Sequence, residues 1–135
     1  MLHEIFKGMD NASEAIDENF KNLSLEYGSN ENGEWIRIPI LGLQYCWKRK
    51  IATGLKTTTS VNDKYFRSET ISWEYPMSFS EVPLVEPSVE KKSNYTIFVG
   101  NDGSNTETTS QNFRILSSHP DSIGDLSAHA FGKYK

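Results

Sequence analysis

Cysteine, basic charge and long apolar runs are all scarce in this sequence. Cys46 is the single cysteine among 135 residues, so the chain cannot form a disulfide within itself. The formal net charge is -4, and no basic stripe of the kind that binds phosphate backbones is present. No apolar run approaches the roughly 20 residues of a membrane helix, and the N-terminus lacks the layout of a signal peptide. We therefore expect a soluble, intracellular chain that binds no nucleic acid and does not insert into membranes.

Catalytic and metal-binding motifs are missing as well. His3, His119 and His129 are scattered outside any zinc-binding pattern, so no metal site is expected. There is no glycine-rich phosphate loop and no G-x-S-x-G motif. Ser118, His119 and Asp121 could be read as a catalytic triad, but any sequence rich in Ser and Asp yields such triples by chance. The sequence predicts no catalytic residue and no cofactor, and hence a protein that is not an enzyme.

Helical periodicity is present in residues 11–23. Asn11 and Glu14 have the spacing of a capping box. Apolar residues recur along one narrow stripe, which comprises Met9, Ala12, Ile16, Phe20 and Leu23. A lone helix of this length is marginal in water, so the stripe must pack on its own β domain or on copies of itself, and its narrowness favours self-association. Residues 1–27 are predicted to be an N-terminal arm and helical stem, and residues 28–135 a β head domain.

Strand-like patterns follow a polar turn at residues 28–33. The predicted strands are 34–38 and 43–51, paired as a hairpin, then 70–75, 84–89, 94–100, 112–116 and 126–134. Pro87 cannot donate to a ladder, so 84–89 is predicted at a sheet edge. The polar stretch 53–69 is predicted to be a long surface loop. About seven short strands indicate a mainly β fold, an antiparallel β-sandwich or barrel preceded by one N-terminal α-helix.

Aromatic residues make up 12% of the chain, and flat ring faces beside polar side chains suit the recognition of sugars. Trp35, Trp47 and Trp73 occupy strand-like positions, which favours a place in the core over a binding platform. Cys46 is interpreted as a small buried hydrophobe rather than a nucleophile. The candidate ligand-binding residues are therefore the polar and aromatic residues of predicted loops, namely Tyr65, Arg67, His119 and Asp121.

Three patches of the sequence look like motifs of one protein family. Residues 28–37 with 44–47 are similar to an N-G-x-Y/W hairpin, residues 73–85 to a W-x-F-P-x-x-F-x-x-P-x-V segment, and residues 127–134 to a terminal A-x-G-x-W strand. The chain thereby resembles the C-terminal head domains of tailed-bacteriophage tail fibres and baseplate receptor-binding proteins. Residues 5–20 are similar to the helical stem that often precedes these domains. Two departures are Ile40-Leu41-Gly42 in place of an Asp-Gly turn, and Tyr134 in place of Trp.

The resemblance implies a homotrimer in the virion, at the tip of a phage tail. Residues 1–27 would be a trimerisation stem, and the chain, made in the host cytoplasm, would attach to other phage tail or baseplate proteins. Its expected ligand is host cell-wall polysaccharide or another surface glycan. A trimer would have three binding sites for this ligand, which would raise its avidity. Two alternatives stay open: a structural baseplate or fibre-joining subunit without receptor binding, and a glycan-degrading tailspike.

Overall fold

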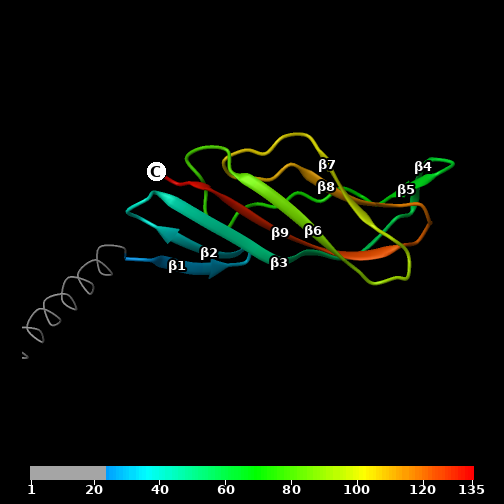
Figure 1. Cartoon of the computed structure of the whole chain (residues 1–135), viewed down its shortest axis with the longest axis horizontal. Helices are drawn as coiled ribbons and strands as arrows, with labels where there is room; N and C mark the ends of the chain where they lie inside the picture. The colour runs from blue at the N-terminus through cyan, green and yellow to red at the C-terminus, as the bar shows by residue number, and fades with distance from the viewer. Residues whose placement is uncertain (1–23) are drawn as a thin grey trace, which may run out of the picture.

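The structure, a computed structural model, describes residues 24–135, which form two antiparallel sheets (Figure 1). The first sheet has the order β1-β2-β3-β9-β6, with the strands Glu26–Asn30, Gly33–Ile38, Leu43–Lys56, Ile123–Lys133 and Leu84–Lys91. The second has the order β4-β5-β8-β7, with the strands Thr59–Asn62, Tyr65–Arg67, Asn112–Ser117 and Phe98–Asp102. The expected mainly β, antiparallel fold is confirmed, with nine strands in the described part rather than about seven.

The predicted helix lies outside the described residues. This applies also to its apolar stripe, which comprises Met9, Ala12, Ile16, Phe20 and Leu23. The first described strand, β1, begins at Glu26, and Tyr27 pairs there with Ile36. Gly28, Ser29 and Asn30 continue the same strand, so the predicted turn at 28–33 is wrong in extent: only Glu31 and Asn32 separate β1 from β2. The division into a stem of residues 1–27 and a head of residues 28–135 stays a prediction.

One hydrophobic core joins the two sheets. β3 and β9 contribute small and medium side chains to it, among them Cys46, Ala128 and Ala130, whereas β8 contributes Phe113 and Ile115. Three further aromatic residues come from the segment between β5 and β6. Trp73 meets Tyr75, and Tyr75 meets Phe79, each edge to face with ring centroids 5.3 Å apart. Bulky rings from this segment therefore fill the space that the small residues of β3 and β9 leave between the sheets.

Two segments differ from the prediction because distant pairing decides them. The stretch 53–69 is not a loop: it contains the end of β3, the strand β4 and the strand β5, which pairs with β8. Residues 70–75 are not a strand, since Ile71 and Glu74 form only isolated bridges to Phe113 and Thr109. Trp73 and Tyr75 are nevertheless buried. β5 is a strand because its backbone pairs with β8, and this pairing does not require apolar side chains. Trp73 and Tyr75 are buried because their rings are apolar, and this burial does not require a strand.

The remaining strands follow the prediction more closely. β2 and β3 form the predicted hairpin, and β6 lies at the edge of its sheet with Pro87 in it, as expected. The strand predicted at 94–100 begins only at Phe98 and runs on to Asp102. In Figure 1, the start of β1 and the C-terminus lie at one end of the molecule, and the β4–β5 hairpin lies at the other. We call the latter the distal end.

Candidate functional site

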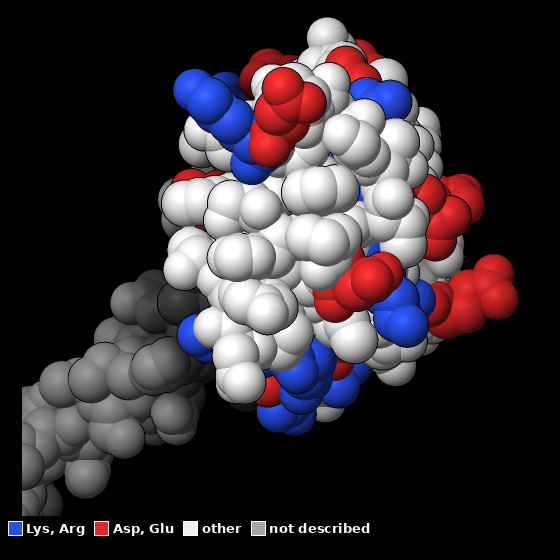
Figure 2. All heavy atoms as spheres, turned by 90° about the vertical axis from the view of Figure 1, so that its right-hand side faces the viewer, with Lys and Arg blue, Asp and Glu red and all other residues white. Residues whose placement is uncertain are grey.

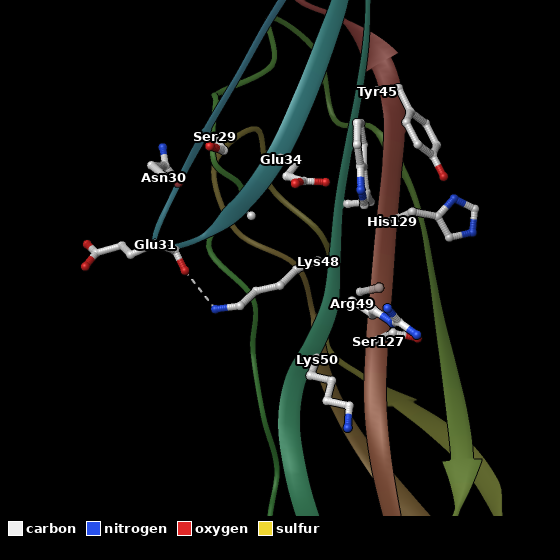
Figure 3. Close-up of a pocket in the computed structure, with 13 residues that line it drawn as sticks. Ser29, Asn30, Glu31, Glu34, Tyr45, Lys48, Arg49, Lys50, Ser127 and His129 are labelled. Carbon is white, nitrogen blue, oxygen red and sulfur yellow. Dashed lines mark hydrogen bonds between the residues drawn. The ribbon is translucent and has the colours of Figure 1, made fainter.

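A groove on the outer face of the five-stranded sheet is the best-formed cavity in the described part of the chain. It has a volume of about 910 Å³. Its walls come from the β1–β2 turn, the middle of β3 and the middle of β9, and Figure 3 shows the labelled side chains around it. The strand order places β3 between β2 and β9, with Glu34 opposite Trp47 and Trp47 opposite His129. Residues that are far apart in the sequence thus meet on one surface.

Three rings form one side of the groove. The centroids of Tyr45 and Trp47 lie 5.4 Å apart with an angle of 31° between the ring planes. Tyr45 and His129 lie 5.6 Å apart at 54°. All three side chains are half-buried, so parts of their faces remain open to a ligand. Such a cluster offers flat apolar surface together with the polar atoms of tyrosine and histidine.

Charged groups surround these rings, and most of them already have partners. The Lys48 ammonium donates to the carbonyl of Glu31 at 2.8 Å, which ties the floor of the groove to the β1–β2 turn (Figure 3). Nε2 of His129 lies 3.3 Å from a carboxylate oxygen of Glu86. Arg49 and Glu34 are exposed at the margin. The groove therefore combines ring faces with both donors and acceptors, as a polyhydroxylated ligand requires.

Below the basic end of the groove, Asp125 holds β3 and β9 together. Lys50 Nζ lies 3.1 Å from its carboxylate, and the backbone N–H of Gly54 donates to it at 2.9 Å. The Gly54 hydrogen bond, followed by the Lys50 ammonium, lowers the pKa of Asp125 below its usual value. Lys50 is thereby occupied in a structural contact, and Lys48 and Arg49 are the basic side chains nearest the rings that are free of a carboxylate partner among the described residues.

The β1–β2 turn forms the wall of the groove opposite the rings, and hydrogen bonds hold this turn in place. The Asn30 carboxamide oxygen accepts from the backbone N–H of Asn32 at 2.9 Å, and its NH₂ group donates to the carbonyl of Pro76. Gly33 has φ of 136°, and a Cβ there would stand 2.4 Å from the carbonyl oxygen of Trp47. Only glycine fits at this position. The indole N–H of Trp73 donates to the carbonyl of Asn32 at 2.7 Å, so the core also anchors the turn.

The rings point outward because β3 buries its alternate residues. Gln44 and Cys46 are almost completely buried, at 1% and 0% exposure. The Gln44 side chain is satisfied there: it donates to the carbonyls of Met77 and Ser78 and accepts from Arg37 Nε at 2.7 Å. Cys46 is buried, as expected from the sequence, and this burial raises the pKa of its thiol to about 11.

The four residues predicted from the sequence as ligand contacts lie apart from the groove, at the distal end. Tyr65 and Arg67 are exposed on β5, and His119 and Asp121 follow β8, with which β5 pairs. His119 stacks on Tyr95 with centroids 3.9 Å apart. Asp121 has φ of 58°, and its backbone N–H donates to the backbone carbonyl of Thr57, which is buried. Figure 2 shows this end: uncharged side chains cover most of it, with acidic and basic groups mostly toward the margin.

The structure brings those four residues to one end of the molecule, and the sequence did not predict the groove. Trp47 was expected in the core, whereas it lines the groove, and His129 was not considered as a ligand contact. Of the three tryptophans, Trp73 alone is fully buried. The available signal was the alternation in Leu43–Trp47, in which either set of side chains can face inward.

Among residues 24–135, no group of three or more His, Cys, Asp or Glu side chains is placed to hold a metal ion. Within the same range, no helix is long and apolar enough to cross a membrane.

Comparison with known proteins gives a match in structure alone. No family model matches the chain, and no curated protein sequence does. The fold is similar to that of pyocin tail fibres. One such structure, the C-terminal residues 323–701 of the P. aeruginosa R1 pyocin fibre, has a TM-score of 0.53 and 15% identity; the match covers 82% of this chain and 28% of that one. An N-truncated R1-type pyocin tail fibre has a TM-score of 0.50 and 17% identity; the match covers 90% of this chain and 95% of that one.

These values establish likeness of fold. The resemblance to tail-fibre head domains that the three sequence patches indicate is confirmed at that level. This chain spans less than a third of the first of the two fibre structures, so most of that protein has no counterpart here.

Proposed function

We propose that this chain is a tail-fibre or baseplate domain of a phage tail, and that it adheres as a homotrimer to a glycan of the host cell surface. The observation that carries the proposal is an aromatic groove on a fold shared with pyocin tail fibres. The chain is proposed to be part of the virion after synthesis in the host cytoplasm, and to bind other tail or baseplate proteins. It is proposed to have no enzymatic activity.

Support for a glycan as ligand comes from the chemistry of the groove. The faces of Tyr45 and Trp47 suit the apolar face of a sugar ring, and His129, Arg49 and Glu34 supply donors and acceptors for its hydroxyl groups. Three such sites in a trimer would convert a modest single-site affinity into firm adhesion.

The test is binding of the full chain to an array of bacterial surface polysaccharides and lipopolysaccharides. Trp47→Ala removes a large ring face, and burial of one such side chain stabilises a complex by about 1.5–3 kcal/mol, so binding should weaken at least about tenfold. Tyr65→Ala at the distal end is the matched control and should bind as the wild type does. Loss of binding in Tyr65→Ala or Asp121→Ala with Trp47→Ala unaffected would place the ligand at the distal end instead.

A joining subunit without receptor binding is the second candidate. Exposed apolar side chains favour it, because Leu84 and Phe131 are 76% and 45% exposed, as expected of a surface that meets other protein. A chain of this kind would bind nothing on the array, yet would be captured by purified phage tails. The third candidate, a tailspike, would release reducing ends from the polysaccharides, and we expect none.

A further inference from the structure

A row of apolar side chains crosses the outer face of the five-stranded sheet from edge to edge. The register pairs Tyr27 with Ile36, Ile36 with Tyr45, Tyr45 with Phe131, and Phe131 with Leu84. Residues directly opposite each other in a ladder point to the same face, so these five side chains form one continuous row across β1, β2, β3, β9 and β6. We call them the apolar row. Four inter-strand spacings of about 4.8 Å give it a length of about 19 Å.

The apolar row is poorly covered by the rest of the described chain. Tyr27 and Leu84, at its two ends, are 80% and 76% exposed, and Phe131 is 45% exposed. Ile36 and Tyr45 are half-buried. Scattered single apolar residues are ordinary on a protein surface, but a contiguous set marks a contact site.

The composition of the row is that of the core of a protein–protein interface. It contains three aromatic and two aliphatic residues and no charged one. Such cores are enriched in aromatic residues and depleted of charge, whereas their margins are polar. The charges lie in the next row along the strands, where Glu34, Trp47, His129 and Glu86 follow one another across the sheet. Glu34, Trp47 and His129 of that second row line the groove, so the groove borders the apolar row.

The chain itself indicates what covers this surface. Met9, Ile16 and Leu23 precede β1 at seven-residue spacing, the repeat of helices that pair with copies of themselves. Leu23 stands only four residues before Tyr27, at the β1 end of the row. Copies joined through this segment would have their β1 strands close together.

We propose that the apolar row packs against a second copy of this chain, and that the groove consequently lies at the border between subunits. The proposal rests on the proposed homotrimer, and adds to it the surface through which the β domains meet. Partner subunits would cover Tyr27, Phe131 and Leu84. Tyr45, which belongs to both the row and the groove, would be shared by the contact and the groove, with Trp47 and His129 at the margin of the contact.

The test uses the full chain with one charge placed at either end of the row, in Tyr27→Glu and Leu84→Glu. Both side chains are more than three-quarters exposed in the single chain, so a glutamate there stays solvated and the fold, checked by circular dichroism, should be retained. Phe98→Glu is the matched control, because Phe98 is 61% exposed on β7 at the edge of the other sheet. Light scattering through a dilution series measures the mass and the concentration at which subunits separate.

We expect the wild type and Phe98→Glu to have a mass of three times 15.3 kDa at high concentration. Tyr27→Glu and Leu84→Glu should dissociate at a concentration at least about tenfold higher, since charges brought together in a desolvated contact repel. Row variants that dissociate as the wild type does would overturn the proposal, and so would a wild type that stays at 15.3 kDa at every concentration. If Leu84→Glu in such a monomer exposes residues 1–23 to protease, the chain covers its own row.

Adhesion measured on the same samples separates this proposal from the proposed function. If the row variants dissociate but the wild type binds no polysaccharide on the array, the intersubunit contact stands and glycan adhesion fails. If a monomeric wild type binds, adhesion stands and the intersubunit contact fails.

Discussion

Trp73 and Tyr75 offer a paired test of how the core supports the groove. Their rings meet edge to face, and both are at least 96% buried. The Trp73 indole N–H donates to the carbonyl of Asn32 in the β1–β2 turn at 2.7 Å. By contrast, the hydroxyl of Tyr75 is buried without a hydrogen-bond partner among the described residues. Replacing each residue by phenylalanine therefore removes a satisfied polar group in one case and an unsatisfied one in the other.

The expected magnitudes follow from these contacts. Trp73→Phe loses one hydrogen bond, which contributes about 1 kcal/mol. It also loses about 40 Å² of buried apolar surface, which contributes about 1 kcal/mol more at about 25 cal/mol per Å². The free energy of unfolding should fall by about 2 kcal/mol. Tyr75→Phe should leave it unchanged or raise it by up to about 1 kcal/mol, because an unsatisfied buried hydroxyl destabilises the fold.

The assay is urea unfolding followed by circular dichroism, which does not depend on the fluorescence of the tryptophan that is replaced. The slope of the free energy against urea should be the same in the wild type and both variants. Equal losses in the two variants would refute the reasoning, since they would show that the unpartnered Tyr75 hydroxyl contributes as much stability as the Trp73 indole with its hydrogen bond. Trp73→Phe should also weaken glycan binding, because the β1–β2 turn forms one wall of the groove.

Three further outcomes are expected. The pKa of Asp125 is lowered in the folded state, so its ionised form stabilises the fold above the ordinary aspartate pKa of about 3.9, and this contribution disappears as the pH falls through the lower folded pKa. The difference in free energy of unfolding between the wild type and Asp125→Asn, measured from about pH 5 to about pH 2, should become smaller as the pH falls. A difference that stays constant would contradict a stabilising role of the ionised Asp125 carboxylate. Gly33→Ala should cost roughly 2 kcal/mol or more, because of its positive φ and the approach to the Trp47 carbonyl, and a variant as stable as the wild type would contradict that geometry. The Cys46 thiol, with a pKa of about 11, should react with iodoacetamide only upon unfolding, as followed by mass spectrometry, and rapid labelling of the native chain would count against its burial.

The strand positions that sequence could predict are those governed by local signals. Pro87 cannot donate to a ladder, and it lies on an edge strand. The β2–β3 hairpin, β8 and β9 all coincide closely with apolar runs bounded by turn residues. Length and composition likewise sufficed for the class of fold, because many short β-rich segments in a chain of this size close into packed sheets.

Distant pairing set the parts that sequence could not predict. β4 and β5 lie in a stretch of mostly polar residues that is typical of a loop, and β5 is a strand because β8 lies beside it. The segment around Trp73 has the alternation of a strand, yet it is irregular chain that forms only isolated bridges and directs its rings into the core. In both cases the neighbour in space outweighed the local preference of the segment.

The sequence by itself determined that the chain is mainly β, that Cys46 belongs to the core, and that Pro87 marks an edge, since each of these depends on the residue and its immediate neighbours. Only the tertiary structure decided which face of β3 is buried. Ala128 and Ala130 on β9 leave room beneath that strand, the rings of Trp73, Tyr75 and Phe79 fill it, and the carbonyls of Met77 and Ser78 satisfy Gln44. With Gln44 and Cys46 thereby turned inward, the pleat turns Tyr45 and Trp47 outward, and both the groove and the apolar row follow from that choice.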